Sequence, residues 1–278
     1  MMGVEELCLA AGMSRSNYYK VRRARTRRQI DESLVLELVA GIRAVHPKLG
    51  SRKLLGRLRP DLKDAGVSIG RDRFFALLGA HELLIQRKAR SVRTTWSSHG
   101  LRHWPNTAKT LDLTGPNQLW VSDITYLRLM DGFVFLALVM DAWSRAIVGY
   151  DCSDSLEMQG ALGALSMAIK SMPEGASPVH HSDRGCQYCS QAYIEKLKAH
   201  GLGISMTEGN HCYENAQAER LNGILKQEYG LGETLHNTTQ AQKMAEQAVS
   251  LYNDDRPHGA IGNHVPMELH RGLVRLTG

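Results

Sequence analysis

The sequence predicts an α/β fold, in which a mixed sheet is flanked by helices, preceded by an all-α, basic, helix-turn-helix-like region. Three observations predict it. From residue 118 onward, runs of strand length alternate with segments of helical period. The longest apolar run, residues 133–140, suits a buried strand and is too short to span a bilayer. Residues 1–110 carry 22 Lys and Arg against 9 Asp and Glu, whereas the remaining residues carry 12 against 19.

The N-terminal part has the pattern of short helices. In residues 4–20, Gly12 can supply a turn and Ser14 an N-cap, which indicates a helix-turn-helix or, equally, an ordinary helical hairpin. After a run of arginines, Asp31 is expected to begin a helix that ends at Val45. Two further short helices are expected, over residues 52–58 and 71–79.

The uneven charge predicts a basic arm that holds a polyanion and an acidic body that acts on it. Arginines are densest between residues 22 and 28. A basic solvated surface without a partner is the alternative interpretation. The candidate DNA-contacting residues of the arm are Arg52, Lys53, Arg71 and Arg73.

The C-terminal part predicts the element order β-β-β-α-β-α-β-α. Strands are expected over residues 118–128 and 133–141, joined by a hairpin turn at Asp131-Gly132, and near 145–150. The remaining elements are a helix over 156–170, a strand that ends at Asp183, a helix over 191–200, a strand over 203–206 and a helix that carries Glu219. This order describes a mixed sheet with helices packed on it.

Three acidic residues occupy positions where a site is expected. Asp123 lies in the middle of a strand among apolar neighbours, where a lone carboxylate is costly to bury unless it is paired or bound to metal. Asp183 ends a strand just before Arg184-Gly185. Carboxylates select Mg²⁺ or Mn²⁺ over zinc. Asp123, Asp183 and Glu219 are therefore expected to bind two such ions and to serve phosphodiester chemistry on nucleic acid.

A helical projection supports the assignment of Glu219. Asn215, Asn222 and Lys226 fall within about 60° of Glu219. The apolar side chains Ala218, Leu221, Ile224 and Leu225 fall on the opposite face and are expected to pack on the sheet. Taken alone, this pattern fits an ordinary amphipathic surface helix better, so the assignment depends on the other two acids.

Cysteines and histidines in the same region suggest a competing metal site. Cys186 and Cys189 have the spacing of half a zinc site, but His211 and Cys212 are adjacent and would point apart. We expect loop and strand residues here rather than zinc. His180 and His181 are expected to pack or to contact phosphate.

Several segments together resemble a known family. Trp120-Val-Ser-Asp-Ile-Thr-Tyr126, His181-Ser-Asp-Arg-Gly-Cys-Gln-Tyr188 and Asn215-Ala-Gln-Ala-Glu219 with Leu225-Lys-Gln-Glu228 resemble the integrase core of DDE transposases. The best match is the longer, second-frame product of bacterial insertion sequences encoded by two overlapping frames. Residues 252–258 with 265–268 resemble that family's ending, and residues 14–19 and 46–52 its N-terminal region. The resemblance covers nearly the whole chain, and its specificity comes from the order and spacing of the motifs.

The resemblance implies an RNase H-like fold and a mechanism. It implies that Asp123 bridges both metals, that Asp183 binds one ion and that Glu219 binds the other. It also implies hydrolytic nicking at the ends of the element, followed by attack of the freed 3′-hydroxyl on another phosphodiester, without a covalent protein–DNA intermediate. The candidate DNA contacts of the core are Arg184, Asn215, Asn222 and Lys226.

Two departures from the family are visible. Glu214-Asn215 stands where Asp-Asn is more usual, and the full upstream helix-turn-helix and leucine-zipper frame is missing. Binding of the element ends is therefore expected to depend on the upstream-frame product or on a frameshift fusion with it. The other expected partners are DNA, as element ends and as target, and further copies of this chain on the DNA.

The expected domain organisation is a partial helix-turn-helix and basic segment, a basic three-helix DNA-binding region, a linker, the integrase catalytic core, and a C-terminal helix and tail. Their bounds are residues 1–30, 31–90, 91–112, 113–235 and 236–278. The N-terminus lacks a signal-peptide pattern and the five cysteines have no disulfide framework. The expected location is the bacterial cytoplasm, at the nucleoid, with no membrane partner.

Two other classes of function remain open at this stage. One is an RNase H-like nuclease that does not transfer strands, since it would use the same metals. The other is an inactive DNA-binding regulator, which the three intact acids argue against.

Overall fold

The computed structural model describes residues 3–85, 102–155, 158–208 and 215–276. The chain divides into two compact units, Met1–Arg87 and Lys88–Gly278, here called the N-terminal and C-terminal units. Each unit has its own hydrophobic core: one cluster of buried side chains in the N-terminal unit and two in the C-terminal unit.

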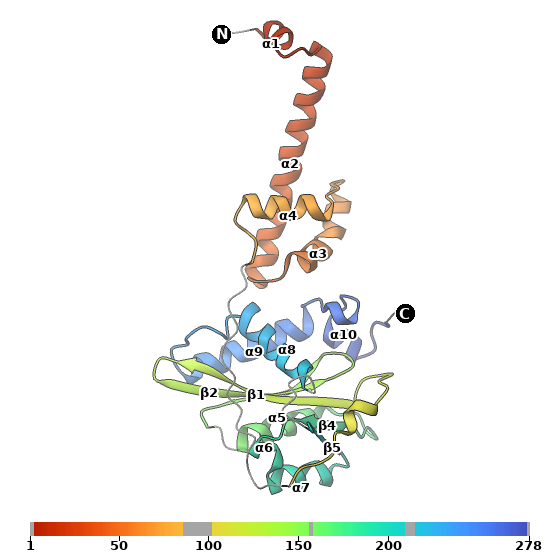
Figure 1. The fold of residues 1–278 in the computed structure, drawn as a ribbon, viewed down its shortest axis with the longest axis vertical. Helices are drawn as coiled ribbons and strands as arrows, with labels where there is room; N and C mark the ends of the chain where they lie inside the picture. The colour runs from red at the N-terminus through yellow and green to blue at the C-terminus, as the bar shows by residue number, and fades with distance from the viewer. Residues whose placement is uncertain (1–2, 86–101, 156–157, 209–214, 277–278) are drawn as a thin grey trace. The chain divides into compact units, whose positions relative to one another are not determined.

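The N-terminal unit is all helical. Its helices are α1 (Val4–Ala10), α2 (Arg15–Val45), α3 (Ser51–Asp64) and α4 (Arg71–Ala80). The C-terminal part of α2 packs with α3 and α4 around Val35, Val39 and the leucines of α3 (Figure 1). Gly12 has φ +63° and the Ser14 side chain accepts a hydrogen bond from the Asn17 backbone N–H, so the turn and the N-cap form as expected.

Two helices of this unit are longer than the sequence predicts. α2 runs without a break from Arg15, so no helix begins at Asp31. The reason is that no glycine or proline occurs between residues 15 and 40, and Arg, Ala and Gln are good helix formers. α3 continues past Pro60 because Leu62 extends the buried stripe of Leu54, Leu55 and Leu58.

The C-terminal unit is built on a five-stranded mixed sheet. Its strands are β1 (Leu119–Leu129), β2 (Gly132–Asp141), β3 (Ile147–Ser153), β4 (Val179–Ser182) and β5 (Gly203–Met206). Their order across the sheet is β3-β2-β1-β4-β5. β1, β2 and β3 are mutually antiparallel, whereas β4 runs parallel to β1 and β5 parallel to β4. This arrangement confirms the expected mixed sheet.

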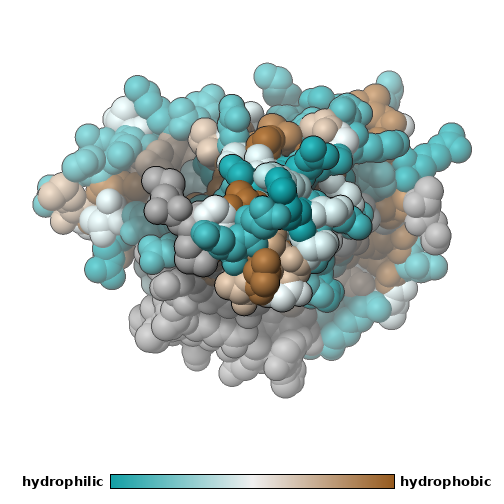
Figure 2. Space-filling view, turned by 90° about the horizontal axis from the view of Figure 1, so that it is seen from above, coloured by the Kyte–Doolittle hydropathy of each residue, from teal (hydrophilic) through white to brown (hydrophobic). Residues whose placement is uncertain are grey.

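Helices cover both faces of the sheet (Figure 1). α5 (Met158–Ser171), α6 (Cys186–Cys189) and α7 (Gln191–Ala199) lie on one face, and α8 (Ala216–Glu228), α9 (Thr238–Asp254) and α10 (Pro266–His270) on the other. Two short 3₁₀ helices, η1 (Thr107–Thr110) and η2 (Gly259–Ile261), complete the unit. On the face drawn in Figure 2, hydrophilic side chains predominate and hydrophobic ones are scattered among them.

Part of the stretch expected as a linker packs on the sheet. The Asn106 N–H donates to the Glu208 carboxylate at 3.2 Å and the Ala108 N–H to Ser205 Oγ at 3.1 Å. Lys109 also forms an ion pair with Glu208 at 3.2 Å. Residues 106–109 therefore lie beside the end of β5, while residues 91–101 of the predicted linker fall outside the described residues.

The contact between β3 and α5 depends on Gly149. A Cβ at this position would lie 2.9 Å from the Ala168 backbone N and would also clash with the Ala164 carbonyl. We expect Gly149→Ala to lower the free energy of unfolding by about 2–3 kcal/mol through overpacking. Gly223→Ala is the control, since its Cβ would meet nothing within 4 Å in α8. Urea denaturation should show a loss for Gly149→Ala and a small gain for Gly223→Ala; similar stability for both variants would contradict the close approach.

Candidate functional site

Asp123 lies on the face of β1 that α8 covers. Side chains alternate along a strand, and Leu119, Val121 and Leu127 belong to the core cluster that includes α8. Asp123 shares their parity and faces the same side. Its cross-strand neighbour on β2 is the buried Leu138. A carboxylate is thereby held half-buried on an otherwise apolar sheet face.

Asp183 follows the end of β4, the strand that pairs with β1 in parallel. The register places Leu119 beside Val179 and Val121 beside His181. The same offset, continued for two residues, brings Asp183 level with Asp123. The Asp183 side chain accepts a hydrogen bond from the Gly185 backbone N–H at 2.9 Å. This contact fixes the carboxylate at the turn into α6.

Glu219 occupies the first turn of α8 and is exposed. Two amides fasten this helix to β1. The Asn215 side chain donates to the Ser122 carbonyl at 3.0 Å, and Asn222 Nδ2 donates to Asp123 Oδ2 at 2.6 Å. Both amides are buried, and the Oδ1 atom of each has no hydrogen-bond partner. On the expected polar face of α8, the exposed Glu219 thus lies between the buried Asn215 and Asn222. The apolar side chains of the opposite face fill the core as expected: Ala218, Leu221, Ile224 and Leu225.

The charges of the three acids interact. The pKa of Asp123 is raised to about 8, chiefly by burial and then by the negative charge of Asp183, with a smaller contribution from Glu219. Hydrogen bonds from Ile124 and Asn222 act in the opposite direction. In the absence of a cation, Asp123 holds a proton near neutral pH, because burial disfavours its charged form and the carboxylates of Asp183 and Glu219 repel that charge.

Lys226 lies on the same side of α8, two turns after Glu219. Its Nζ sits 4.4 Å from the centroid of the Tyr126 ring, a cation–π contact with β1. Burial lowers the pKa of Lys226, and the charge of Asp123 opposes this shift. Lys226 therefore lies close enough to Asp123 for the two side chains to interact electrostatically. Arg184, by contrast, donates from Nε to the Thr207 carbonyl at 2.5 Å and links the β4 end to the residue after β5.

Beneath Asp123, on the other face of β1, lies a buried polar network. His180 Nε2 is 2.7 Å from Ser122 Oγ and 2.9 Å from the Tyr193 hydroxyl. Burial lowers the pKa of His180 to about 3, so this imidazole is neutral at physiological pH. His181 is also buried, with Nδ1 2.9 Å from Ser205 Oγ. Both histidines pack, which is one of the two roles expected for them.

The donors around Asp123 are carboxylates, as a hard divalent cation requires. Within the described ranges, no group of three or more His, Cys, Asp or Glu side chains is arranged to hold a metal ion. Asp123 and Asp183 instead turn oxygens toward Asn222 and the Gly185 N–H. The chemistry nevertheless fits a hard cation, since the donors are carboxylates and their repulsion at Asp123 is what a bound cation would relieve.

The cysteines have another environment. Cys189 is buried, with Sγ 3.7 Å from Met206 Sδ and 3.9 Å from His103 Nδ1. The pKa of Cys189 is raised to about 11, chiefly by burial and also by the charge of Asp183, so without a bound metal this residue is a thiol at neutral pH. Cys186 is exposed, and His211 and Cys212 of the zinc alternative lie outside the described residues.

The four candidate DNA contacts of the arm lie on α3 and α4. Arg52 is exposed and Lys53 half-buried. Arg71 forms an exposed ion pair with Asp72 at 2.8 Å, and Arg73 pairs with Glu32 at 3.1 Å. Exposed pairs of this kind are weak, so a phosphate can compete for either guanidinium.

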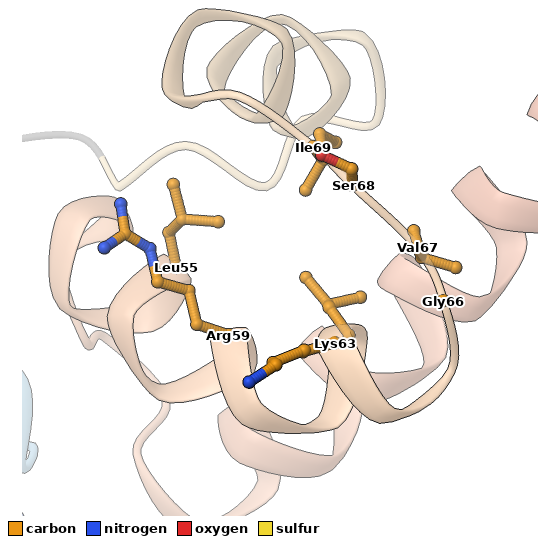
Figure 3. Close-up of a pocket in the computed structure, with 8 residues that line it drawn as sticks. Leu55, Arg59, Lys63, Gly66, Val67, Ser68 and Ile69 are labelled. Carbon is orange, nitrogen blue, oxygen red and sulfur yellow. The ribbon is translucent and has the colours of Figure 1, made fainter.

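A shallow pocket in the N-terminal unit contains none of the three acids. It has a volume of about 400 Å³ and lies between α3 and the segment that leads to α4. Figure 3 shows Leu55, Val67 and Ile69 around it, with the cationic side chains of Arg59 and Lys63 along α3.

None of the helices in the described ranges is both long enough and apolar enough to cross a bilayer.

One further anchor was not visible in the sequence. Arg256 is fully buried and donates from Nε and Nη2 to the two carboxylate oxygens of Glu228, at 2.8 Å each. Glu228 is the last residue of α8. Asn253 binds the Ile147 backbone in β3 through both side-chain atoms, at 2.8 Å each. The last turn of α9 therefore holds the outer strand of the sheet through Asn253, and the segment after α9 holds the end of α8 through Arg256.

Comparison with known families identifies the C-terminal unit. Residues 114–212 match one family model described as an integrase core domain, and residues 200–266 match a second with the same description. The two matches together cover β1 to the start of α10, including all three acids.

Similar proteins are products of insertion elements. The uncharacterized 31 kDa protein of insertion element IS600 from Shigella sonnei is 35% identical, over 94% of this chain and 96% of its own length. The transposase for insertion sequence element IS629 from Shigella sonnei is 31% identical, over 99% of this chain and 94% of its own. The transposase InsF for insertion sequence IS3A from Escherichia coli K12 is 32% identical, over 83% and 80%.

Solved structures with a similar backbone fold include viral integrases. The catalytic core domain of HTLV-2 integrase, solved in complex with magnesium, is 19% identical over 56% of this chain and 98% of its own, with a TM-score of 0.46. The simian T-cell lymphotropic virus intasome has a chain that is 16% identical over 86% of this chain and 77% of its own, with a TM-score of 0.48.

Proposed function

Because this chain belongs to the integrase-core transposases of bacterial insertion sequences, we propose that Asp123, Asp183 and Glu219 form its catalytic site. A transposase acts on DNA, in DNA transposition. The observation that supports the assignment is electrostatic: the carboxylates of Asp183 and Glu219 both act on the half-buried Asp123. A site that gathers negative charge at a half-buried carboxylate is suited to bind divalent cations.

We propose that these three carboxylates bind two divalent cations, either Mg²⁺ or Mn²⁺. The chemistry that bound cations supply is activation of the attacking oxygen and stabilisation of the leaving oxygen in an in-line displacement. The first attack is by water at the end of the element and the second by the freed 3′-hydroxyl on another phosphodiester. Asp123, Asp183 and Glu219 would hold these cations, with Asp123 as the central ligand of the three.

The chain's own residues would orient the site. Asn222 holds the Asp123 carboxylate, and Asn215 holds the β1 backbone beside it, so both would position Asp123 and Glu219 relative to each other. Lys226 would receive a phosphate of the bound DNA, since its ammonium lies beside the acids at the surface of α8. Arg184 would support the turn that carries Asp183.

The proposed division of labour gives the catalytic chemistry to the C-terminal unit and DNA holding to the N-terminal unit. Arg52, Lys53, Arg71 and Arg73 would contact phosphates of the element ends. We further propose that several copies assemble on the DNA in the bacterial cytoplasm, with the upstream-frame product or a fusion to it supplying the recognition of the ends.

The test supplies the purified chain with labelled duplex DNA that carries its own element ends, in Mg²⁺. We expect joined products that a Glu219→Gln variant does not form. Cleaved ends without joining would favour a nuclease instead. If joining appears only after the upstream-frame product is added, that product is the missing partner. No reaction with it, or equal reaction by Glu219→Gln, would reject the proposed site.

A further inference from the structure

The N-terminal half of α2 projects beyond the core of its own unit. The buried residues of α2 are Val35 and Val39, and every residue from Tyr19 to Ile30 is exposed. In Figure 1, α2 continues past α3 and α4 as one straight helix toward α1. The arginine run, which the sequence suggested as a break between helices, is therefore presented on a continuous rigid element.

The cations of this segment surround the helix and form two groups whose mean directions are opposed. With Arg22 taken as zero, Arg15, Arg25 and Arg28 project at roughly 20°, 300° and 240°, at about 100° per residue. Lys20, Arg23 and Arg27 project at roughly 160°, 100° and 140°. The mean directions of the two groups, here called the Arg22 face and the Arg23 face, differ by about 170°. No acidic residue interrupts residues 15–30.

Two opposed basic faces are unusual for a helix that lies on a flat polyanionic surface, because such a surface contacts one side. They suit a groove with negative charge on both walls. The major groove of DNA is about 12 Å wide and admits an α-helix between two rows of phosphates. From Arg15 to Arg28 the helix rises about 20 Å, which is long enough to follow several phosphates on each strand.

The free helix also carries repulsion that such a groove would relieve. Arg23 and Arg27 are four residues apart, and Arg22, Arg25 and Arg28 are three apart, so like charges are neighbours on each face. Residues 19–30 bury no apolar side chain that would offset this cost. Two rows of phosphates would neutralise the positive charges of both groups and so relieve the repulsion within each.

We propose that residues 15–28 of α2 lie in the major groove of duplex DNA, with the Arg22 face on one phosphate row and the Arg23 face on the other. This inference rests on the proposed function, which identifies the polyanion as DNA. It adds to that function the surface of the N-terminal unit that binds the DNA. Contacts to phosphates carry no sequence information, so the interaction is independent of sequence. It adds a DNA-holding element to the cations on α3 and α4.

The experiment measures binding of the full chain to a fluorescent duplex of arbitrary sequence, without divalent metal, across a series of salt concentrations. One triple variant is Arg22→Gln/Arg25→Gln/Arg28→Gln and the other is Lys20→Gln/Arg23→Gln/Arg27→Gln. Glutamine is a good helix former, and circular dichroism checks that α2 persists. The control is Lys170→Gln/Lys198→Gln/Lys243→Gln, which removes the same charge from exposed positions of the C-terminal unit.

Each α2 triple should lower the slope of log K against log salt by about 2.7, since three phosphate contacts are lost, and combining them should double the effect. The control should leave the slope unchanged. A loss with only one triple would overturn the two-sided groove, and a loss no larger than that of the control would overturn the DNA-binding role. Loss of binding to anionic vesicles but not to DNA would make the surface a membrane site. Because no metal is present, the result does not depend on whether the chain cleaves DNA.

Discussion

Asp123→Asn is expected to abolish metal-dependent cleavage and joining of DNA, by a factor of about 10³ or more, while DNA binding persists. That factor corresponds to about 4 kcal/mol of lost stabilisation, which is within what a metal ligand at the reacting phosphate can supply. The same loss is expected for Asp183→Asn and Glu219→Gln. Substantial activity in any one of the three variants would reject the site.

The same substitution should make the metal-free protein more stable. The pKa of Asp123 is raised in the folded protein to about 8, above its ordinary value of 3.8. The folded state therefore binds a proton that the unfolded state releases, and stability is lost as the pH rises from about 4 through 8. Asparagine cannot ionise, so the variant does not lose stability in this way as the pH rises. At pH 8 we expect Asp123→Asn to raise the free energy of unfolding by about 2 kcal/mol, which allows for partial exposure of the carboxylate, and the Tm by about 4–8 °C.

Thermal melts across pH, with and without Mg²⁺, check this expectation. Mg²⁺ should raise the Tm of the wild type and have little effect on Asp123→Asn, because the cation replaces the proton. Asp131→Asn is the matched control, since Asp131 is an exposed acid in the turn between β1 and β2. If Asp123→Asn melts at the same temperature as the wild type at pH 8, the charge of Asp123 does not destabilise the metal-free protein.

Much of the sheet could be predicted because its signals are local. The Asp131-Gly132 turn fixes the β1–β2 hairpin, and the apolar run of β2 marks a strand buried on both faces. The projection of α8 also separated the core face from the polar face. These inferences need only the spacing of residues along one element.

The relation between elements could not be predicted in the same way. That Asp183 continues the register beside Asp123 follows from parallel pairing between strands about 60 residues apart, which no local pattern encodes. Asn222 was placed correctly on the polar face, but its contact with Asp123 depends on how closely α8 packs on β1. The unbroken α2 was missed because a dense arginine run was interpreted as a junction, although it contains no helix-breaking residue.

The second large effect concerns the end of α8. Arg256 forms a bidentate ion pair with Glu228 and stacks 5.5 Å from the Tyr252 ring. The Arg256 side chain has no exposed surface and that of Glu228 is 16% exposed. Arg256→Met should lower the free energy of unfolding by about 3–5 kcal/mol, because it leaves a carboxylate without its partner in a largely buried position. The Tm should fall by about 6–20 °C.

The double variant Arg256→Met/Glu228→Leu separates stability from positioning. Replacing both partners by apolar groups of similar size is often neutral, so this variant should regain most of the lost stability. If it regains stability but not DNA joining, the ion pair also fixes where α8 presents Glu219; if both return, its role is stability alone. Lys109→Met provides the control, because the Lys109–Glu208 pair is more than half exposed on both sides and should contribute less than about 1 kcal/mol. An equal cost for the buried and the exposed pair would show that the segment after α9 does not anchor α8.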